Sequence, residues 1–183
     1  MYVPESAERE MLRQSLRRFL DRECPRDKVR QWDEEDYYPR DVVDKLRTLG
    51  VYGLTTPEEY GGLGRDIPAA IITIEELCRR CPTVGVAYIM TVFYGAVNIN
   101  ESGNAEQKRQ LLPRLAAGEM RFAYGLSEPN VGADLASVET AADLEGDVFV
   151  VNGAKRWCTG ANIADYIYTL VRTDRQAPRY QNL

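Results

Sequence analysis

Histidine is absent from this chain of 183 residues. Its absence removes the side chain that most often serves as a general base near neutral pH and that most often binds transition metals. Ser-His and Cys-His nucleophilic catalysis are therefore excluded within these residues, and we expect no metal site.

Cysteine is scarce as well, with four residues at Cys24, Cys78, Cys81 and Cys158. So few scattered thiols do not make a disulfide framework, which agrees with a reducing compartment. Cys78 and Cys81 form a C-x-x-C pair, but a closed zinc site needs four ligands and a redox motif needs a thioredoxin-like context. Because EELCRRCP is typical of a helix that stops near Pro82, we expect both to be packing residues.

Long apolar runs and an excess of basic residues are also missing. The net charge is −5, and nucleic-acid-binding proteins usually carry basic patches, so we expect no nucleic-acid partner. The first residues, MYVPESAEREM, are charged where a secretory signal needs an apolar core, and they are not enriched in Arg and Ser as an organelle transit peptide is. With 44% hydrophobic and 28% charged residues, the composition is typical of a soluble protein, which we expect to be cytoplasmic.

Helical periodicity fills the first part of the chain. The first predicted helix, Glu8 to Arg22, is amphipathic, and the second, Arg40 to Leu49, has Pro39 before it and Gly50 as its stop. Two strongly apolar helices follow a loop rich in Gly and Pro, and we expect them to be too short and too interrupted to span a membrane. These two, and a last helix that Pro113 should kink or end, cover residues 69–80, 83–99 and 105–116.

Strand-like patterns begin after Gly118. Phe122, Tyr124 and Leu126 alternate with small residues, and residues 138–142 and 166–172 are further candidates. The pair Asn152-Gly153 predicts a two-residue turn between strands 147–151 and 154–158. We therefore expect a helical domain at residues 1–120 and a partial β domain at residues 121–183, with only about four or five strands.

The strand region carries residues that suit a flat cofactor with a polar edge, such as a flavin. Such a ring needs hydrogen bonds at its edge, an apolar surface against its face and close backbone approach near a pyrophosphate. In YGLSEPNVGAD, Tyr124 and Leu126 offer backbone or ring contacts. Ser127 offers a hydroxyl, and Gly132 offers room for close approach beside Ala133.

A second segment adds to the predicted cofactor site. Trp157 offers a broad apolar plane, and Thr159, expected on the same strand face, offers a hydroxyl. The residues alone leave a plainer interpretation open. In that interpretation Pro129 to Gly132 is a turn, Trp157 is a core residue of the hairpin, and Ser127 is a capping hydroxyl.

Several motifs together resemble the acyl-CoA dehydrogenase family. The family pattern has an aromatic residue, a hydroxyl residue followed by Glu-Pro, then Gly, a small residue and Asp, and about two dozen residues later an N-G-x-K-x-W-x-T run. Here these positions are Tyr124, Ser127 to Pro129, Gly132 to Asp134, and Asn152 to Thr159. The runs PEEYGGLG, EEL and SGNAEQKRQLLPRLAAGE are similar to landmarks of the family's helical domain, so the resemblance covers nearly the whole chain.

This resemblance implies an α+β protein with an all-α N-terminal domain and a truncated, antiparallel β-barrel-like middle domain, without the family's C-terminal helical bundle. It implies FAD as cofactor and dehydrogenation of an acyl-CoA substrate to a trans-2-enoyl-CoA, with hydride transfer to flavin N5. Electrons would pass to an electron-transfer flavoprotein or a similar acceptor, and the full-length protein would be a homotetramer. The implied flavin contacts are Tyr124, Leu126, Ser127, Gly132, Ala133, Trp157, Cys158 and Thr159.

Two departures from the family pattern bear on the reaction. Ala133 replaces a serine that the family commonly has, so one hydroxyl contact worth about 1 kcal/mol is missing. The family's catalytic glutamate lies in the C-terminal domain, and Glu128 and Asp134 are similar to groups that brace a loop rather than to the base. We therefore expect the 183 residues to be an inactive part of a longer protein.

The resemblance places the substrate at Ala133, near the CoA thioester arm, and along the apolar helix after EEL, at Met90, Phe93 and Tyr94. Bulky side chains in that helix either shorten the acyl pocket or belong to the core. Two rival functions stay open. Flavin monooxygenases and nitroalkane oxidases share this architecture, and a non-catalytic partner subunit would supply only a packing surface.

Overall fold

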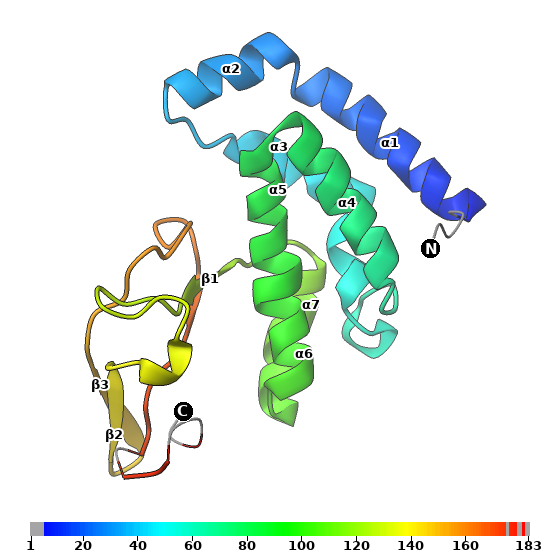
Figure 1. Cartoon of the computed structure of the whole chain (residues 1–183). Helices are drawn as coiled ribbons and strands as arrows, with labels where there is room; N and C mark the ends of the chain where they lie inside the picture. The colour runs from blue at the N-terminus through cyan, green and yellow to red at the C-terminus, as the bar shows by residue number, and fades with distance from the viewer. Residues whose placement is uncertain (1–5, 175, 179–180, 182–183) are drawn as a thin grey trace. The chain divides into compact units, whose positions relative to one another are not determined.

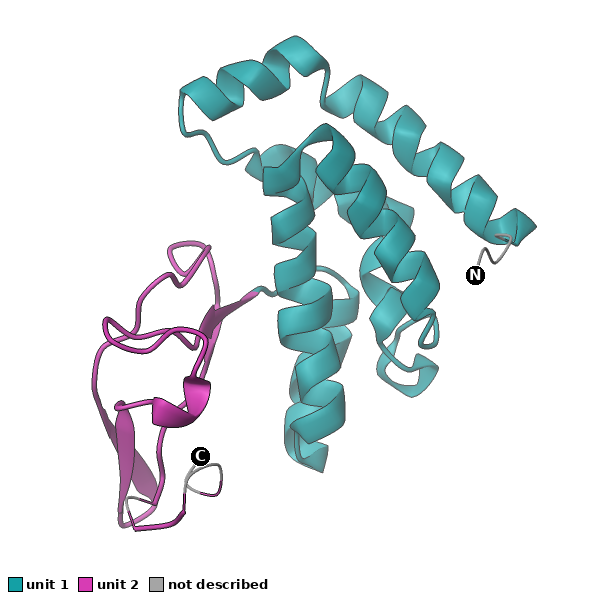
Figure 2. Ribbon diagram, in the orientation of Figure 1, with its two compact units in different colours: residues 1–121 teal, residues 122–183 magenta. Residues whose placement is uncertain are grey.

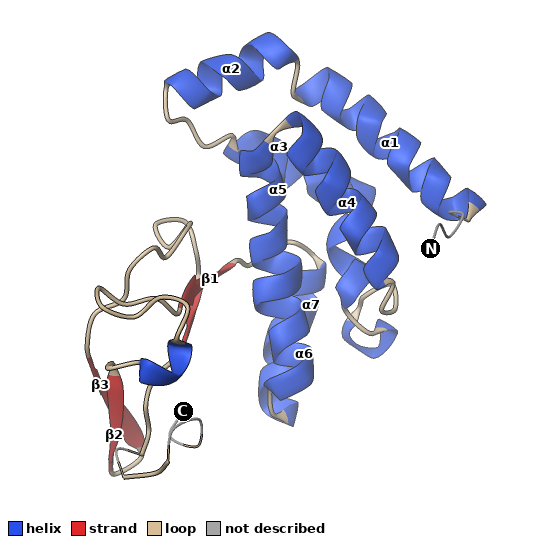
Figure 3. Cartoon of the chain, viewed as in Figure 1, coloured by secondary structure: helices blue, strands red, loops and turns tan. Residues whose placement is uncertain are grey.

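The computed structural model describes residues 6–174, 176–178 and 181. The chain divides into two compact units, which we call the helical unit (residues 1–121) and the β unit (residues 122–183) (Figure 2). Helices make up the first, and all the strands of the described residues lie in the second (Figure 3).

The helical unit begins with α1 (Ala7–Glu23), which the Ser6 side chain caps by accepting a hydrogen bond from the backbone N–H of Arg9. Next comes α2 (Arg26–Glu34), which the sequence pattern did not predict (Figure 1). Trp32 is the one buried residue along α2, and Val29 packs partly buried against the core, so only two apolar residues mark the inner face of this helix. α3 (Arg40–Lys45) continues into η1 (Leu46–Leu49) and stops at Gly50, in agreement with the predicted helix.

Two 3-10 turns, η2 (Val51–Thr55) and η3 (Glu58–Tyr60), lead to α4 (Ile67–Arg80). The Asp66 carboxylate caps α4 by accepting from the N–H of Ala69 at 3.0 Å. The last helix, α7 (Ala105–Ala116), begins with a capping box between Asn104 and Gln107. It runs on past Pro113, so that proline does not end it.

One helical rod is longer than the sequence suggested. α5 (Pro82–Ile89), the π-helix η4 (Met90–Val97) and α6 (Asn98–Ser102) follow one another without a break over 21 residues. The expectation that this segment is too short and interrupted to span a membrane was therefore wrong: by length and composition alone it is able to do so. However, 56% of its apolar stretch is buried inside the protein, which is equally typical of a core helix.

The core of the helical unit gathers around α4 and α5, with α1 packed against α4. Two tyrosines lie at its centre, Tyr52 and Tyr88, each 1% exposed or less, with ring centroids 5.5 Å apart. Their hydroxyls donate to the carbonyls of Val43 at 3.1 Å and Val51 at 3.0 Å, so neither polar end is buried without a partner. Other core residues are Leu16, Phe19, Leu20, Val42, Leu46, Leu77 and Val84.

Gly62 lies where the loop after η3 passes the chain before it. A Cβ atom at this position would overlap the backbone carbonyl of Thr56. We therefore expect Gly62→Ala to lower the free energy of unfolding by about 2–4 kcal/mol, as measured by urea unfolding. Its neighbour Gly61 is the matched control, because it has φ +81° but open space, and alanine there should cost only about 1–2 kcal/mol. An effect at Gly62 no larger than at Gly61 would contradict the close approach.

The β unit contains two small sheets. β1 (Phe122–Gly125) pairs in parallel with β4 (Tyr166–Thr169), and β2 (Ala141–Glu145) pairs antiparallel with β3 (Val148–Asn152). No barrel closes among the residues that the structure describes. On the parallel pair, Phe122 faces Tyr166 and Tyr124 faces Tyr168, with ring centroids 5.2 Å and 6.0 Å apart.

The predicted hairpin at Asn152-Gly153 is wrong. The turn lies instead at residues 146 and 147, where Gly146 has φ +62° and joins β2 to β3. Gly153 serves another purpose, because a Cβ there would overlap the side chain and backbone of Thr140. Residues 154–158 form no strand, and the strand predicted at 138–142 begins only at Ala141.

Candidate cofactor site

Hydrogen bonds bring together the two segments that the sequence singled out. The backbone N–H of Arg156 donates to the carbonyl of Ser127 at 2.7 Å. Lys155 Nζ donates to the carbonyl of Leu126 at 3.2 Å and to Glu128 Oε1 at 2.8 Å. Residues 126–128 and 155–156 therefore lie side by side, although each belongs to a different stretch of irregular chain.

Glu128 is the anchor of this junction. Its carboxylate is buried, and it accepts from the backbone N–H groups of Glu139 at 2.6 Å and Thr140 at 2.9 Å as well as from Lys155. Burial by itself raises the pKa of this carboxyl, but the Lys155 ammonium and the Thr140 and Glu139 donors outweigh it and lower the pKa to about 2. Glu128 thus stays ionised, and its carboxylate oxygens are engaged in hydrogen bonds. It braces the loop as the sequence predicted.

The loop after Glu128 is a tight turn. The N–H of Glu128 donates to the carbonyl of Val131 at 2.8 Å, and the N–H of Val131 donates back at 3.2 Å. Gly132 and Ala133 follow on the surface, and nothing lies within 4 Å of a Cβ placed at Gly132. Asp134 accepts from the Ser137 hydroxyl at 2.6 Å. The turn of the plainer interpretation is therefore present, and it leaves open space beside the Gly132 backbone.

Trp157 is neither a core residue nor part of a strand. Its side chain is 74% exposed, and its backbone has φ +61°, a left-handed conformation that is rare for a bulky residue. The residue before it, Arg156, is held by the hydrogen bond from its backbone N–H to the carbonyl of Ser127. On the other side, the N–H of Thr159 donates to the carbonyl of Trp157 at 2.9 Å. The expectation that Trp157 and Thr159 share a strand face is therefore wrong. The strained backbone instead presents an indole plane at the surface, with the Arg156 guanidinium 4.3 Å from its ring centroid.

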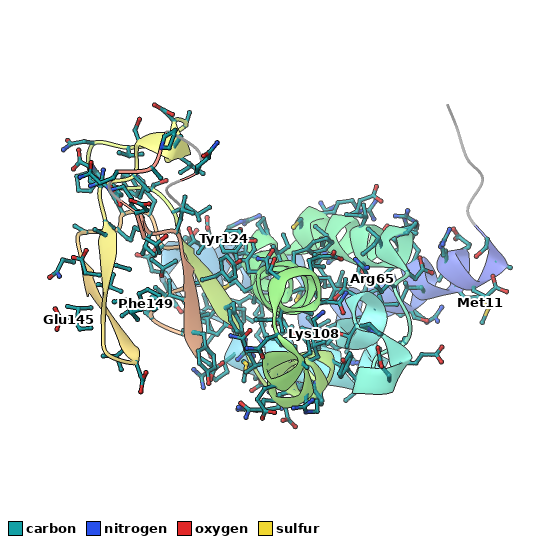
Figure 4. All side chains as sticks on the ribbon, turned by 90° about the horizontal axis from the view of Figure 1, so that it is seen from below. Met11, Arg65, Lys108, Tyr124, Glu145 and Phe149 are labelled. Carbon is teal, nitrogen blue, oxygen red and sulfur yellow. The ribbon has the colours of Figure 1, made fainter. Side chains whose placement is uncertain are left out.

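The other predicted flavin residues lie in the same two stretches. Tyr124 is half-buried beside Tyr168 (Figure 4). Leu126, Ser127 and Cys158 are also half-buried, and Thr159 is exposed. Sequence reasoning missed Lys155 as the bridge between the stretches, although the signal was available in the N-G-x-K-x-W-x-T run.

A separate hollow of about 530 Å³ opens on the β unit and contains none of the predicted flavin residues. Phe149 of β3, which is labelled in Figure 4 and is 59% exposed, is one of its lining residues. The remaining lining is mostly apolar, with Ala142, Val151, Ile167, Thr169, Val171 and Thr173. The two motif segments, rather than this hollow, therefore define the candidate cofactor site.

The predicted substrate residues of the helical unit all lie in the π-helix η4. Met90 is 1% exposed and is a core residue, whereas Phe93 and Tyr94 are half-buried. The Thr55 hydroxyl donates to the carbonyl of Val92 at 3.1 Å inside this turn. Such π-helical turns are frequent at functional sites.

Among residues 6–174, 176–178 and 181, no group of three or more Cys, Asp or Glu side chains is placed to hold a metal ion.

Comparison with known proteins agrees with both units. The family model of the acyl-CoA dehydrogenase N-terminal domain matches residues 6–119, and that of the acyl-CoA dehydrogenase middle domain matches residues 123–183. A short-chain-specific acyl-CoA dehydrogenase of Clostridium acetobutylicum is 40% identical over 168 residues, which cover 92% of this chain and 44% of that protein. The chain thus spans less than half the length of this curated relative.

Solved structures show the same architecture. A glutaryl-coenzyme A dehydrogenase in complex with glutaryl-CoA superposes with a TM-score of 0.88 at 32% identity, covering 95% of this chain and 45% of that one. An acyl-CoA dehydrogenase of Bacillus anthracis, complexed with FAD, gives a TM-score of 0.82 at 29% identity, covering 94% and 31%. The helical unit, the two motif segments and both domain matches lead to one conclusion: this chain belongs to the acyl-CoA dehydrogenase family.

Proposed function

We propose that the full protein is an FAD-dependent acyl-CoA dehydrogenase, to which this chain contributes the N-terminal helical domain and part of the flavin-binding middle domain. The main support is the ion pair between Lys155 and Glu128. It joins the segment around Ser127 (residues 126–128) to the segment around Trp157 (residues 155–159). The two halves of the flavin motif therefore form one surface rather than two unrelated turns.

The residues on this surface fit FAD. Trp157 presents an exposed apolar plane, and Ser127 and Thr159 offer hydroxyls for the polar edge of the ring. The open space at Gly132 allows the backbone to approach a phosphate group closely. Bound FAD supplies the acceptor for the β-hydrogen of the substrate.

The proposed reaction also needs a base that removes the α-proton of the acyl-CoA thioester. Glu128 is unsuited to this task, because its carboxylate is buried, fully engaged and has a pKa lowered to about 2. Asp134 is engaged with Ser137. We place the base outside these 183 residues, in the C-terminal helical domain of the full protein, and we propose that an electron-transfer flavoprotein reoxidises the flavin of a tetrameric enzyme.

Anaerobic mixing of the full-length protein with acyl-CoA thioesters tests this function. If the protein is a dehydrogenase, the visible absorbance of its flavin should be lost on mixing, because the acyl-CoA substrate itself reduces the flavin. Nitroalkanes added in place of the thioesters serve as the comparison. Bleaching by nitroalkanes alone would favour the oxidase alternative, and a full-length protein that holds no flavin would favour the non-catalytic partner subunit.

A further inference from the structure

The β2–β3 hairpin of the β unit has one uncovered edge and one exposed apolar face. Among the residues that the structure describes, β3 (Val148–Asn152) pairs with β2 on one side only. Phe149 and Val151 share a sheet face with Leu144 of β2, and these side chains are 59%, 53% and 64% exposed. An apolar sheet face normally packs against other residues. Both the edge and the face of β3 are therefore accessible to a further strand.

The backbone hydrogen bonds show which groups of β3 point outward. Ala142 of β2 lies opposite Val151, and its N–H donates away from β3, to the carbonyl of Arg172 at 2.9 Å. Ala142 and Val151 are therefore a non-hydrogen-bonded pair, so Val151 directs its own N–H and C=O at the open edge. Because these directions alternate along a strand, Phe149 does the same, whereas Val150 directs its groups at β2.

β3 also lacks the features that usually protect an edge strand. Natural edge strands avoid pairing with other chains by means of charged residues, prolines or bulges. The sequence of β3, VFVVN, contains no charged residue and no proline. Its register with β2 runs from Val148 to Asn152 without a bulge. Another strand can therefore pair along the whole of this edge without meeting a charge.

The edge of β3 is complementary to itself. If two copies run antiparallel with Val150 opposite Val150, then Phe149 of each copy lies opposite Val151 of the other. These are the residues whose backbone groups point outward, so each such pair can exchange both of its hydrogen bonds. An aromatic side chain opposite a β-branched one is a favourable cross-strand pair. Asp147, just before β3, would lie opposite Gly153, so no like charges meet.

We propose that this chain forms a two-fold dimer through the open edge of β3, centred on Val150. The two Val150 residues form a non-hydrogen-bonded pair with Cα atoms about 4.5 Å apart. The apolar face of one hairpin continues into that of the second copy, and the two-fold symmetry closes the assembly at two chains. One pair of strand edges buries less than the about 1,200 Å² of a standard stable complex, so the dimer forms at micromolar rather than nanomolar concentration.

Disulfide trapping in the chain of 183 residues tests the register. Under mild oxidation Val150→Cys should give a dimer that dithiothreitol separates, because the two new thiols face each other at a distance that a disulfide spans. Val148→Cys is the matched control on the same face of β3. Its symmetry mate lies about 14 Å away along the strand, so it should cross-link no more than the wild type with its own four cysteines.

Sedimentation velocity without oxidant tests the association itself. The wild type should approach twice the 20.7 kDa of one chain as its micromolar concentration rises. Val150→Lys should weaken the dimer at least about tenfold, because two like charges then lie directly opposite each other. In Val148→Lys each new charge faces Asn152 instead, so the loss should be smaller. Circular dichroism verifies that every variant is folded.

Three outcomes would overturn the proposal. A wild type that stays monomeric throughout the micromolar range would show that β3 is left open or is covered by a different chain segment. Equal cross-linking of Val148→Cys and Val150→Cys would exclude the two-fold register. An unchanged dimer in Val150→Lys would place the interface elsewhere. None of these measurements involves flavin or acyl-CoA, so the proposed function stands or fails separately.

Discussion

Replacement of Glu76 by glutamine is expected to lower the free energy of unfolding by about 3–5 kcal/mol. Glu76 lies on α4 and is 2% exposed. Its carboxylate accepts from Arg13 Nη1 at 2.6 Å and from Arg17 Nη2 and Nε at 2.7 Å and 3.0 Å, and all three bonds join α4 to α1. Glutamine keeps the shape but removes the charge that Arg17 contacts and one of the two carboxylates that Arg13 contacts, so the α1–α4 interface loses its main polar link.

The neighbouring Glu75 supplies the control. Its carboxylate also accepts from Arg13 Nη1, at 2.9 Å, but its side chain is 61% exposed. Because exposed ion pairs contribute little, Glu75→Gln should cost under about 1 kcal/mol. Urea unfolding followed by circular dichroism at neutral pH measures both variants. Equal losses at the two positions would refute the role of the buried cluster.

Acid titration gives an independent check of the same cluster. The Arg17 hydrogen bond lowers the pKa of Glu76, burial opposes it, and with Arg13 and the nearby arginines the pKa falls to about 2. A carboxyl whose pKa is lower in the folded protein stabilises it above the unfolded pKa and loses this contribution as the pH falls toward the folded pKa. The wild type should therefore lose stability between about pH 4.5 and pH 2, and Glu76→Gln should lose less over that range.

Replacement of Lys155 by methionine is expected to weaken FAD binding by the full-length protein at least about tenfold and to destabilise the β unit by about 3 kcal/mol. Methionine has a similar length but no charge, so it leaves the buried Glu128 carboxylate with only its two backbone donors. The Ser127 and Trp157 segments then lose the side-chain bond that joins them. Equilibrium titration of the apoprotein with FAD, followed by flavin fluorescence, measures the affinity.

A second substitution separates the charge effect from a packing effect. Glu128→Gln in the Lys155→Met background removes the unpaired charge, so the double variant should be more stable than Lys155→Met alone. Arg156→Met is the positional control, because Arg156 lies next to Lys155 in the chain but its side chain is exposed. Its guanidinium stacks on the Trp157 ring, and this cation–π contact contributes about 1 kcal/mol or less. Additive losses in the double variant would mean that Lys155 and Glu128 act separately.

The helix ends were the most predictable part of the fold. Gly50 stops a helix in the structure as it does in the sequence pattern, because local backbone chemistry decides where a helix can end. α2 was missed because only Val29 and Trp32 pack against the core, and two apolar residues are too few to define a helical period. The hairpin was misplaced because Asn152-Gly153 fits the local pattern of a two-residue turn. In the structure Gly153 is instead required by close packing, since a Cβ atom there would overlap Thr140.

The candidate site was predictable in its parts but not in its assembly. The residue types indicated the segments around Ser127 and Trp157, and the resemblance to the family implied the bracing role of Glu128, because both signals are local in the chain. The bond from Lys155 to Glu128 joins residues 27 positions apart, and no periodicity in either segment encodes it. The left-handed backbone at Trp157 was equally hidden, because the surrounding hydrogen bonds impose it against the preference of the residue.

The parallel pairing of β1 with β4 sets the order in which this site can form. Both motif segments lie in the stretch of chain that connects β1 to β4. The two ends of this connection are joined where the backbone N–H of Leu170 donates to the carbonyl of Gly125 at 3.1 Å. During synthesis the Ser127 segment leaves the ribosome well before the strand that completes its foundation. Contacts of such long sequence separation form slowly, so we expect the helical unit to fold first and the cofactor surface to form late.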